Sequence, residues 1–207
     1  PYFGASLFIW TNIIGVILFA LSIGYYVGGK SADKRTPQSA EKLLYTLLLA
    51  TGILITFIPA VGKFLFNVGY KAIPAYNVSV FLISFAVTLV LFTIPFIMLG
   101  MVTPLAVKVQ LKDMEHAGST VGRLYAFSTA GSIIGTFIPV LFTIPFLGSR
   151  ETFFLFGALL IIIGVFGLGR LKLLILAAIP LLLSFTARPV HSDASLLFED
   201  ESIYNYV

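Results

Sequence analysis

The first charged side chains of this chain form a cluster that directly follows a long apolar run. Gly28 and Gly29 close the run, and Asp33 and Arg35 follow within "GGKSADKR". Paired glycines suit the C-terminus of a helix or a close crossing of two helices, and cations beyond a helix end complement its negative pole. Asp33 can accept hydrogen bonds from the N-terminus of a neighbouring helix or pair with a basic residue across the loop. A solvated basic loop accounts for the same residues equally well, so both interpretations stay open.

No arrangement of residues in the sequence indicates catalysis or metal binding. His116 and His191 lie in different loops, at opposite ends of the helices expected below, so they cannot share a metal ion. Cysteine is absent, which excludes disulfides and thiolate sites. Neither a phosphate-binding loop nor a Ser/His/Asp arrangement is found. We therefore assign no catalytic, cofactor-binding or metal-binding residue within these 207 residues.

Polar and small residues inside the apolar stretches are few. All nine acidic residues lie outside those stretches, whereas proton-coupled carriers usually keep an ionisable group near the middle of the membrane. We expect Asn12, Thr129 and Ser132 to make polar contacts within the membrane. Gly131 and Gly135, in "AGSIIG", have the spacing that lets two membrane helices approach closely. Helix packing is therefore the favoured role for these glycines, ahead of ligand binding.

Composition places the chain among helical membrane proteins. It is 58% hydrophobic and only 11% charged, against about 25% charged residues in ordinary soluble domains. Each span of a bilayer core needs about 20 apolar residues in a helix. The sequence predicts an all-α, multi-pass transmembrane bundle in the cell membrane over residues 1–187, with spans at 7–27, 43–62, 78–98, 124–144, 152–169 and 171–187. Its net charge of +4 does not predict a nucleic-acid partner, because basic residues in membrane proteins mostly record orientation.

Basic residues are distributed unequally between the two ends of these spans. Nine of them fall in loops at one end and four at the other. Short cytoplasmic loops are enriched in Lys and Arg, so the loop holding Asp33 is predicted to be cytoplasmic. Both ends of the chain then face outward, provided that the short stretch 171–187 crosses. Residues 188–207 are acidic and end in "SIYNYV", a strand-like run that predicts a linker and the start of a soluble domain.

Two segments resemble the major facilitator superfamily of transporters. "GGKSADKR" is similar to the cytoplasmic signature between its second and third helices, and "VGRLYAFSTAGSIIGTFIPVLFTIPFLGSRETF" to its fifth helix and the link into the sixth. This resemblance implies a half-transporter-like fold. The five spans up to residue 169 would correspond to helices two to six of a six-helix half, and the first helix would precede Pro1.

A resemblance over nearly the whole chain points to spermidine-synthase-like integral membrane proteins. It rests on "PYFGASLFIWTNIIGVILFALSIGYYVGGKSADKR", "IPFIMLGMVTPLAVKV", "GRLYAFSTAGSIIGTFIPVLFTIPFLGSRET" and "FEDESIYNYV". It implies a membrane domain followed by a soluble aminopropyltransferase-type domain, with decarboxylated S-adenosylmethionine as a substrate of that domain. Asn205 stands where the family usually has Gln, which puts a substrate contact there in doubt.

Three functions remain open on these grounds. The membrane domain can anchor the downstream soluble domain and pass it a small molecule, in which case enzyme activity belongs to residues beyond Val207. Alternatively, the chain is a half-size transporter that works as a homodimer, because alternating access rocks one repeat against another. The third option is a purely structural membrane anchor. An outward-facing tail conflicts with a nucleoside substrate, which is scarce outside the cell.

Overall fold

A computed structural model describes residues 7–76, 80–111 and 115–186, and these residues form helices without a strand. The elements are α1 (Leu7–Asp33), α2 (Pro37–Tyr76), α3 (Val80–Gln110), α4 (Ala117–Ile138), the π-helix η1 (Pro139–Thr143), α5 (Ile144–Leu147), α6 (Ser149–Leu168), the 3₁₀-helix η2 (Leu171–Ala177) and α7 (Ala178–Thr186). The prediction of an all-α helical bundle is confirmed. Within the described residues, five helical stretches are long and apolar enough to cross a membrane: 10–33, 37–65, 81–110, 117–147 and 149–168.

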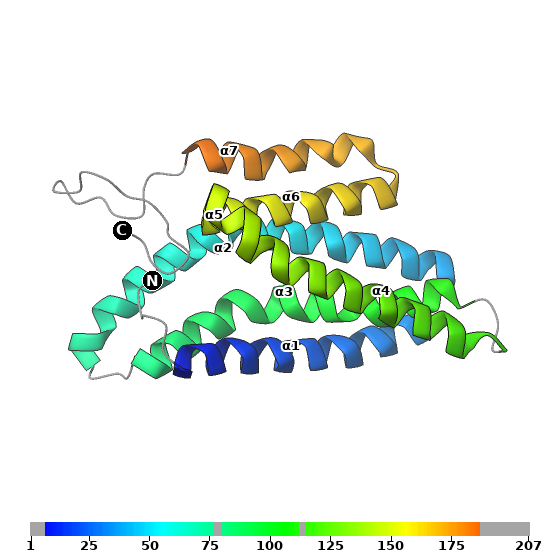
Figure 1. The fold of residues 1–207 in the computed structure, drawn as a ribbon, viewed down its shortest axis with the longest axis horizontal. Coiled ribbons are helices and arrows are strands. Elements are labelled where there is room, and N and C mark those ends of the chain that lie inside the picture. The colour runs from blue at the N-terminus through cyan, green and yellow to red at the C-terminus, as the bar shows by residue number, and fades with distance from the viewer. Residues whose placement is uncertain (1–6, 77–79, 112–114, 187–207) are drawn as a thin grey trace.

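The helices pack as two tight pairs joined through α2 and α3 (Figure 1). α1 lies along α3, and α2 lies along α6. Glycines determine how closely α1 approaches α3. A Cβ placed on Gly24 would lie 2.8 Å from the Cα of Gly100, and one on Gly28 would lie 2.7 Å from the Cα of Met101. Small residues allow this approach where lipid supplies no hydrophobic drive for helices to associate.

α1 continues through both glycines to Asp33, so the idea that Gly28 and Gly29 end the helix is wrong. The alternative, a close helix crossing, holds at Gly28. At Gly29 a Cβ would meet nothing within 4 Å. Close packing against α3 thus explains one of the two glycines.

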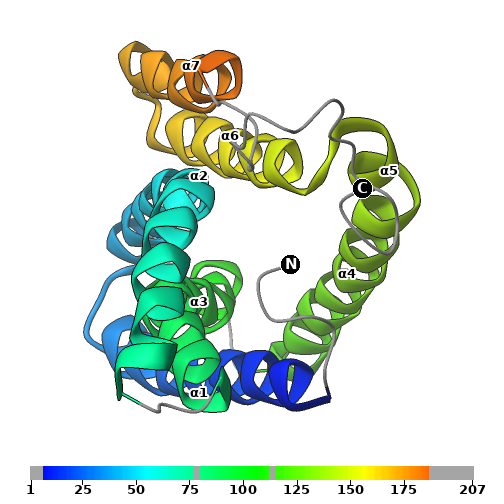
Figure 2. The ribbon, with the colours of Figure 1, turned by 90° about the vertical axis from the view of Figure 1, so that its left-hand side faces the viewer.

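α4 stands apart from the other spans. It has no buried residue, and in a view along the bundle its ribbon stands apart from those of α2 and α6 (Figure 2). After Ile138 the chain passes through the π-helix η1, which begins at Pro139, and then through the short α5. The Oγ1 of Thr152 donates to the backbone oxygen of Gly148 at 2.7 Å, at the start of α6.

The last helical segment returns along α6 (Figure 1). Gly169 ends α6 in the left-handed conformation, with φ 64°, and its N–H donates to the backbone oxygen of Phe166. The segment then begins as seven residues of 3₁₀-helix and continues as nine of α-helix. With rises of about 2.0 and 1.5 Å per residue, its length is about 28 Å. The expected sixth span at 171–187 is thus helical as far as Thr186, and its crossing of the membrane stays a prediction.

Candidate functional site

A cavity of about 450 Å³ lies between α1, α3 and the start of α4. It is at the end of the bundle where α1 ends and α4 begins, which the basic residues predict to be cytoplasmic (Figure 1). Eleven residues line it: Tyr25, Gly29, Ala32, Asp33, Thr103, Pro104, Val107, Lys108, Leu111, Val121 and Tyr125. Two charged groups and three hydroxyls therefore face a largely apolar space.

Helical spacing explains how three elements supply these side chains. Tyr25, Gly29 and Asp33 recur every four residues and so share one face of α1. Thr103 and Val107 do the same on α3. The close α1–α3 crossing brings these faces together, while α4 diverges from both helices and leaves the space between them.

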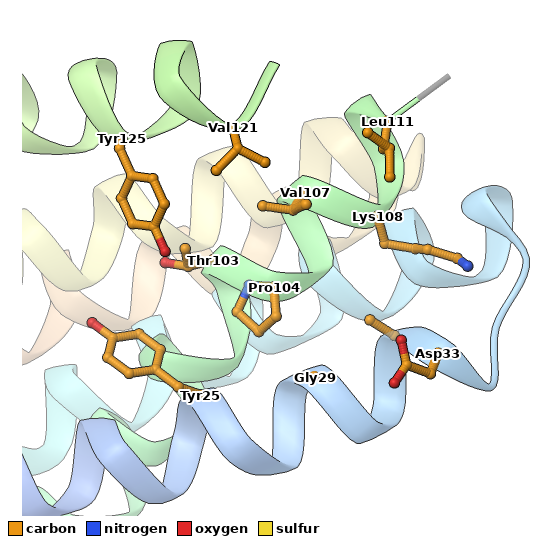
Figure 3. Close-up of a pocket in the computed structure, with 11 residues that line it drawn as sticks. Tyr25, Gly29, Asp33, Thr103, Pro104, Val107, Lys108, Leu111, Val121 and Tyr125 are labelled. Carbon is orange, nitrogen blue, oxygen red and sulfur yellow. The ribbon is translucent and has the colours of Figure 1, made fainter. Parts of the chain in front are cut away.

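The polar lining separates into two groups (Figure 3). The phenol rings of Tyr25 and Tyr125 project toward each other from α1 and α4, beside the hydroxyl of Thr103. Asp33 and Lys108 lie toward the other end of the cavity. Tyr25 and Tyr125 are 49% and 58% exposed, and both line the cavity.

The side chains of Asp33 and Lys108 have no hydrogen bond or ion pair with any described residue. Two of the neighbouring cations contact residues of α1. Arg35 donates from Nη1 to the backbone oxygen of Ser31 at 2.8 Å and to its Oγ, and the Nζ of Lys30 lies 4.5 Å from the centre of the Tyr26 ring. The expected attachment of Asp33 to a helix end or to a basic residue across the loop is therefore absent from the described part of the chain.

Asn12 makes the intramembrane contact expected of it, but away from the cavity. Its side chain is 5% exposed, and its Nδ2 donates to the Oγ of Ser84 at 3.0 Å and to the backbone oxygen of Phe81 at 3.3 Å. Ser84 in turn donates to the same backbone oxygen at 2.9 Å. This network joins α1 to α3, so Asn12 is a structural contact in this fold.

The small and polar residues predicted on α4 have no partner helix among the described residues. Thr129 and Ser132 are exposed, and a Cβ on Gly131 or Gly135 would meet nothing within 4 Å. The backbone oxygen of Ser132 accepts a hydrogen bond from Thr136 of the same helix. Any close packing of these glycines must therefore involve a surface other than the described helices.

Sequence reasoning missed most of the cavity. Among its polar residues Asp33 was singled out, whereas Tyr25, Thr103, Lys108 and Tyr125 were not. The four-residue spacing of Tyr25, Gly29 and Asp33 was a usable signal for one face, but the facing residues come from helices far along the chain. No group of three or more His, Cys, Asp or Glu side chains that could hold a metal ion occurs in the described residues.

Comparison of the chain with protein-family models, with curated proteins and with solved structures finds no match.

Proposed function

We propose that this chain is the membrane domain of a spermidine-synthase-like, that is polyamine aminopropyltransferase-like, protein of the cell membrane. It anchors a downstream soluble domain and passes a small molecule to or from that domain. The observation that supports this proposal is the cavity, because it gives the membrane domain a place for a ligand and not only an anchoring role.

The cavity has the properties of a small-molecule site. Its volume of about 450 Å³ falls in the usual range for such sites, which combine apolar walls with a few polar groups that fix orientation. Pro104, Val107 and Val121 supply apolar wall, while Tyr25 and Tyr125 supply hydroxyls that can donate or accept. The membrane domain thus contributes binding and delivery.

The chemistry itself belongs to the soluble domain in this proposal. In aminopropyl transfer, a diamine nitrogen attacks the propyl carbon bonded to the sulfonium of decarboxylated S-adenosylmethionine. The carbon–sulfur bond breaks, methylthioadenosine leaves, and the nitrogen loses a proton. A soluble domain on the cytoplasmic side would meet this substrate, which requires that residues 171–187 do not cross.

The test measures methylthioadenosine release by the full-length protein in membrane vesicles supplied with decarboxylated S-adenosylmethionine and a diamine. Thr103→Phe fills the cavity and should lower the rate at least about fivefold. Ile94→Phe is the matched control, because Ile94 is on the same helix, 60% exposed and outside the cavity. A wild-type protein that releases no methylthioadenosine refutes the synthase-like proposal, and equal rates in both variants exclude the cavity from the pathway.

The exposure of α4 favours a second candidate, a half-size major-facilitator-like transporter that works as a homodimer. α4 carries Gly131 and Gly135 on an unburied surface, where a second copy could approach closely. Substrate uptake into liposomes together with a dimer in detergent would support this candidate. A strict monomer would contradict it, and a protein with neither uptake nor cavity-dependent activity would be a structural anchor.

A further inference from the structure

Two opposite charges line the same cavity without pairing. The carboxylate of Asp33 comes from the last turn of α1 and the ammonium of Lys108 from the last turns of α3. No nitrogen–oxygen distance of 4 Å or less joins them, and neither has another hydrogen-bonding partner among the described residues. Asp33 is exposed and Lys108 is half-buried, so each of them is available to a ligand.

We propose that the cavity binds a zwitterion, a molecule with a primary ammonium and an anionic oxygen group joined by a short carbon chain. The ammonium lies against Asp33 and the anionic group against Lys108, while the carbon chain contacts Pro104 and Val107. This assignment rests on the proposed function only in taking the cavity as a small-molecule site. The decarboxylated S-adenosylmethionine and diamine of aminopropyl transfer are cations, so the molecule assigned here is a different one.

The pair of charges discriminates against the simpler ligand classes. A cation would satisfy Asp33 but would share the cavity with the ammonium of Lys108, and an anion would meet the carboxylate of Asp33 in the same way. A neutral ligand would displace water from both charges without forming an ion pair with either. Ion pairs with both groups are made only by a ligand that carries both signs.

Residues beyond the charged pair limit the ligand further. Lys30 on α1 contacts the Tyr26 ring, and Arg35, just after α1, donates to Ser31. Lys34, next to Asp33, is exposed and does not line the cavity. These three cations therefore do not turn the cavity into a general anion site. Tyr25 lies two helical turns from Asp33, about 12 Å along α1, so its hydroxyl can reach the far end of an elongated ligand.

The same chemistry occurs in water-soluble amino acids and in the head group of phosphatidylethanolamine. A set of three soluble probes with one carbon skeleton tests the charge requirement: 5-aminopentanoate, pentylamine and pentanoate. Dissociation constants are measured by calorimetry on the full-length protein in phosphatidylcholine nanodiscs. The wild type should bind 5-aminopentanoate at least about tenfold more tightly than either singly charged probe, because each of those loses one charge-assisted hydrogen bond.

Two isosteric variants should each favour a different singly charged probe over 5-aminopentanoate. Asp33→Asn should bind pentanoate more tightly than 5-aminopentanoate, and Lys108→Gln should favour pentylamine. Lys34→Gln, which removes an exposed charge outside the cavity, should leave the wild-type order unchanged. Unchanged thermal unfolding of the three variants verifies that they are folded. Equal binding of the three probes, or the same loss for all probes in both cavity variants, would overturn the proposal.

The lipid source is tested separately by mass spectrometry of protein released from nanodiscs that contain equal amounts of phosphatidylethanolamine and phosphatidylglycerol. Retention of phosphatidylethanolamine by the wild type, with loss in Asp33→Asn, identifies a lipid head group. Binding of 5-aminopentanoate without retained lipid identifies a soluble zwitterion. If the wild type neither retains phosphatidylethanolamine nor binds 5-aminopentanoate, the zwitterion assignment is overturned. The Thr103→Phe measurement of methylthioadenosine release still decides whether a ligand of another charge uses the cavity.

Discussion

Adding one methyl group at Gly24 should separate α1 from α3. In the structure, a Cβ on Gly24 would lie 2.8 Å from the Cα of Gly100 and 3.1 Å from the carbonyl carbon of Ile97. Carbon atoms in contact prefer about 3.5–4.0 Å, so the helices must move apart by about 1 Å at this crossing. The clashing atoms belong to the backbone of α3, and no side-chain rotation can relieve the overlap.

The magnitude follows from two opposing terms. Overpacking in a close-packed contact typically costs about 1–3 kcal/mol. Alanine is a better helix former than glycine by about 1 kcal/mol, which offsets part of that cost. We therefore expect Gly24→Ala to lower the free energy of unfolding by up to about 2 kcal/mol, and to be less stable than a Gly→Ala change at an open helix position by about 1–3 kcal/mol. The separation should also lengthen the hydrogen bond between Asn12 and Ser84 farther along the same contact.

The assay is reversible unfolding in mixed detergent micelles, with the fraction folded followed as denaturing detergent is added. Gly15→Ala is the matched control on the same helix, because a Cβ there meets nothing within 4 Å, and it should be neutral or slightly stabilising. Gly100→Ala should cost about as much as Gly24→Ala, and the double variant should cost less than the sum, since the helices have already separated. Equal stability of Gly24→Ala and Gly15→Ala would refute the role assigned to the crossing.

Two further predictions concern a buried hydroxyl and the position of the tail. Thr51 is fully buried and its Oγ1 has no hydrogen-bond partner among the described residues, so Thr51→Val should raise the free energy of unfolding by about 1 kcal/mol. Thr56→Val should not, because the Oγ1 of Thr56 donates to the backbone oxygen of Gly52 at 2.8 Å; equal effects of both changes would contradict the argument. In intact cells, the distribution of basic residues predicts that an impermeant maleimide labels Ser192→Cys, whereas the proposed function requires Ser192→Cys to be protected. Ser39→Cys should be labelled only after permeabilisation in either case. Position 192 lies outside the described residues, and its protection would mean that residues 171–187 do not cross.

The sequence predicted the helical class and the approximate spans because both depend on local composition. It placed their ends less well. The second span was expected at 43–62, whereas α2 runs from Pro37 to Tyr76, since a helix can continue past the apolar residues that identify it. Gly28 did not end its helix because contact with Met101 and Pro104 of α3 holds the backbone there.

The site was predictable only where the information is local. Asn12 was correctly expected to make a polar contact, since an amide inside a membrane needs a partner. For the glycines of α4, local information was not sufficient. Their spacing indicates a surface suited to close packing, but it does not indicate which helix packs against that surface. The cavity depends on the divergence of α4 from α1 and α3, a tertiary feature that no single segment encodes.

The 3₁₀ start of the last helical segment has a mechanical consequence. The 16 residues of η2 and α7 extend about 28 Å as they are, but only about 24 Å when fully α-helical. Exchange between i+3 and i+4 hydrogen bonding within η2 would therefore bring the two ends of the segment about 4 Å closer together. Membranes of the secretory pathway differ in hydrocarbon thickness by about the same amount. If residues 171–187 cross the membrane, this exchange would let the segment match bilayers of different thickness, which a straight α-helix of the same 16 residues could not do.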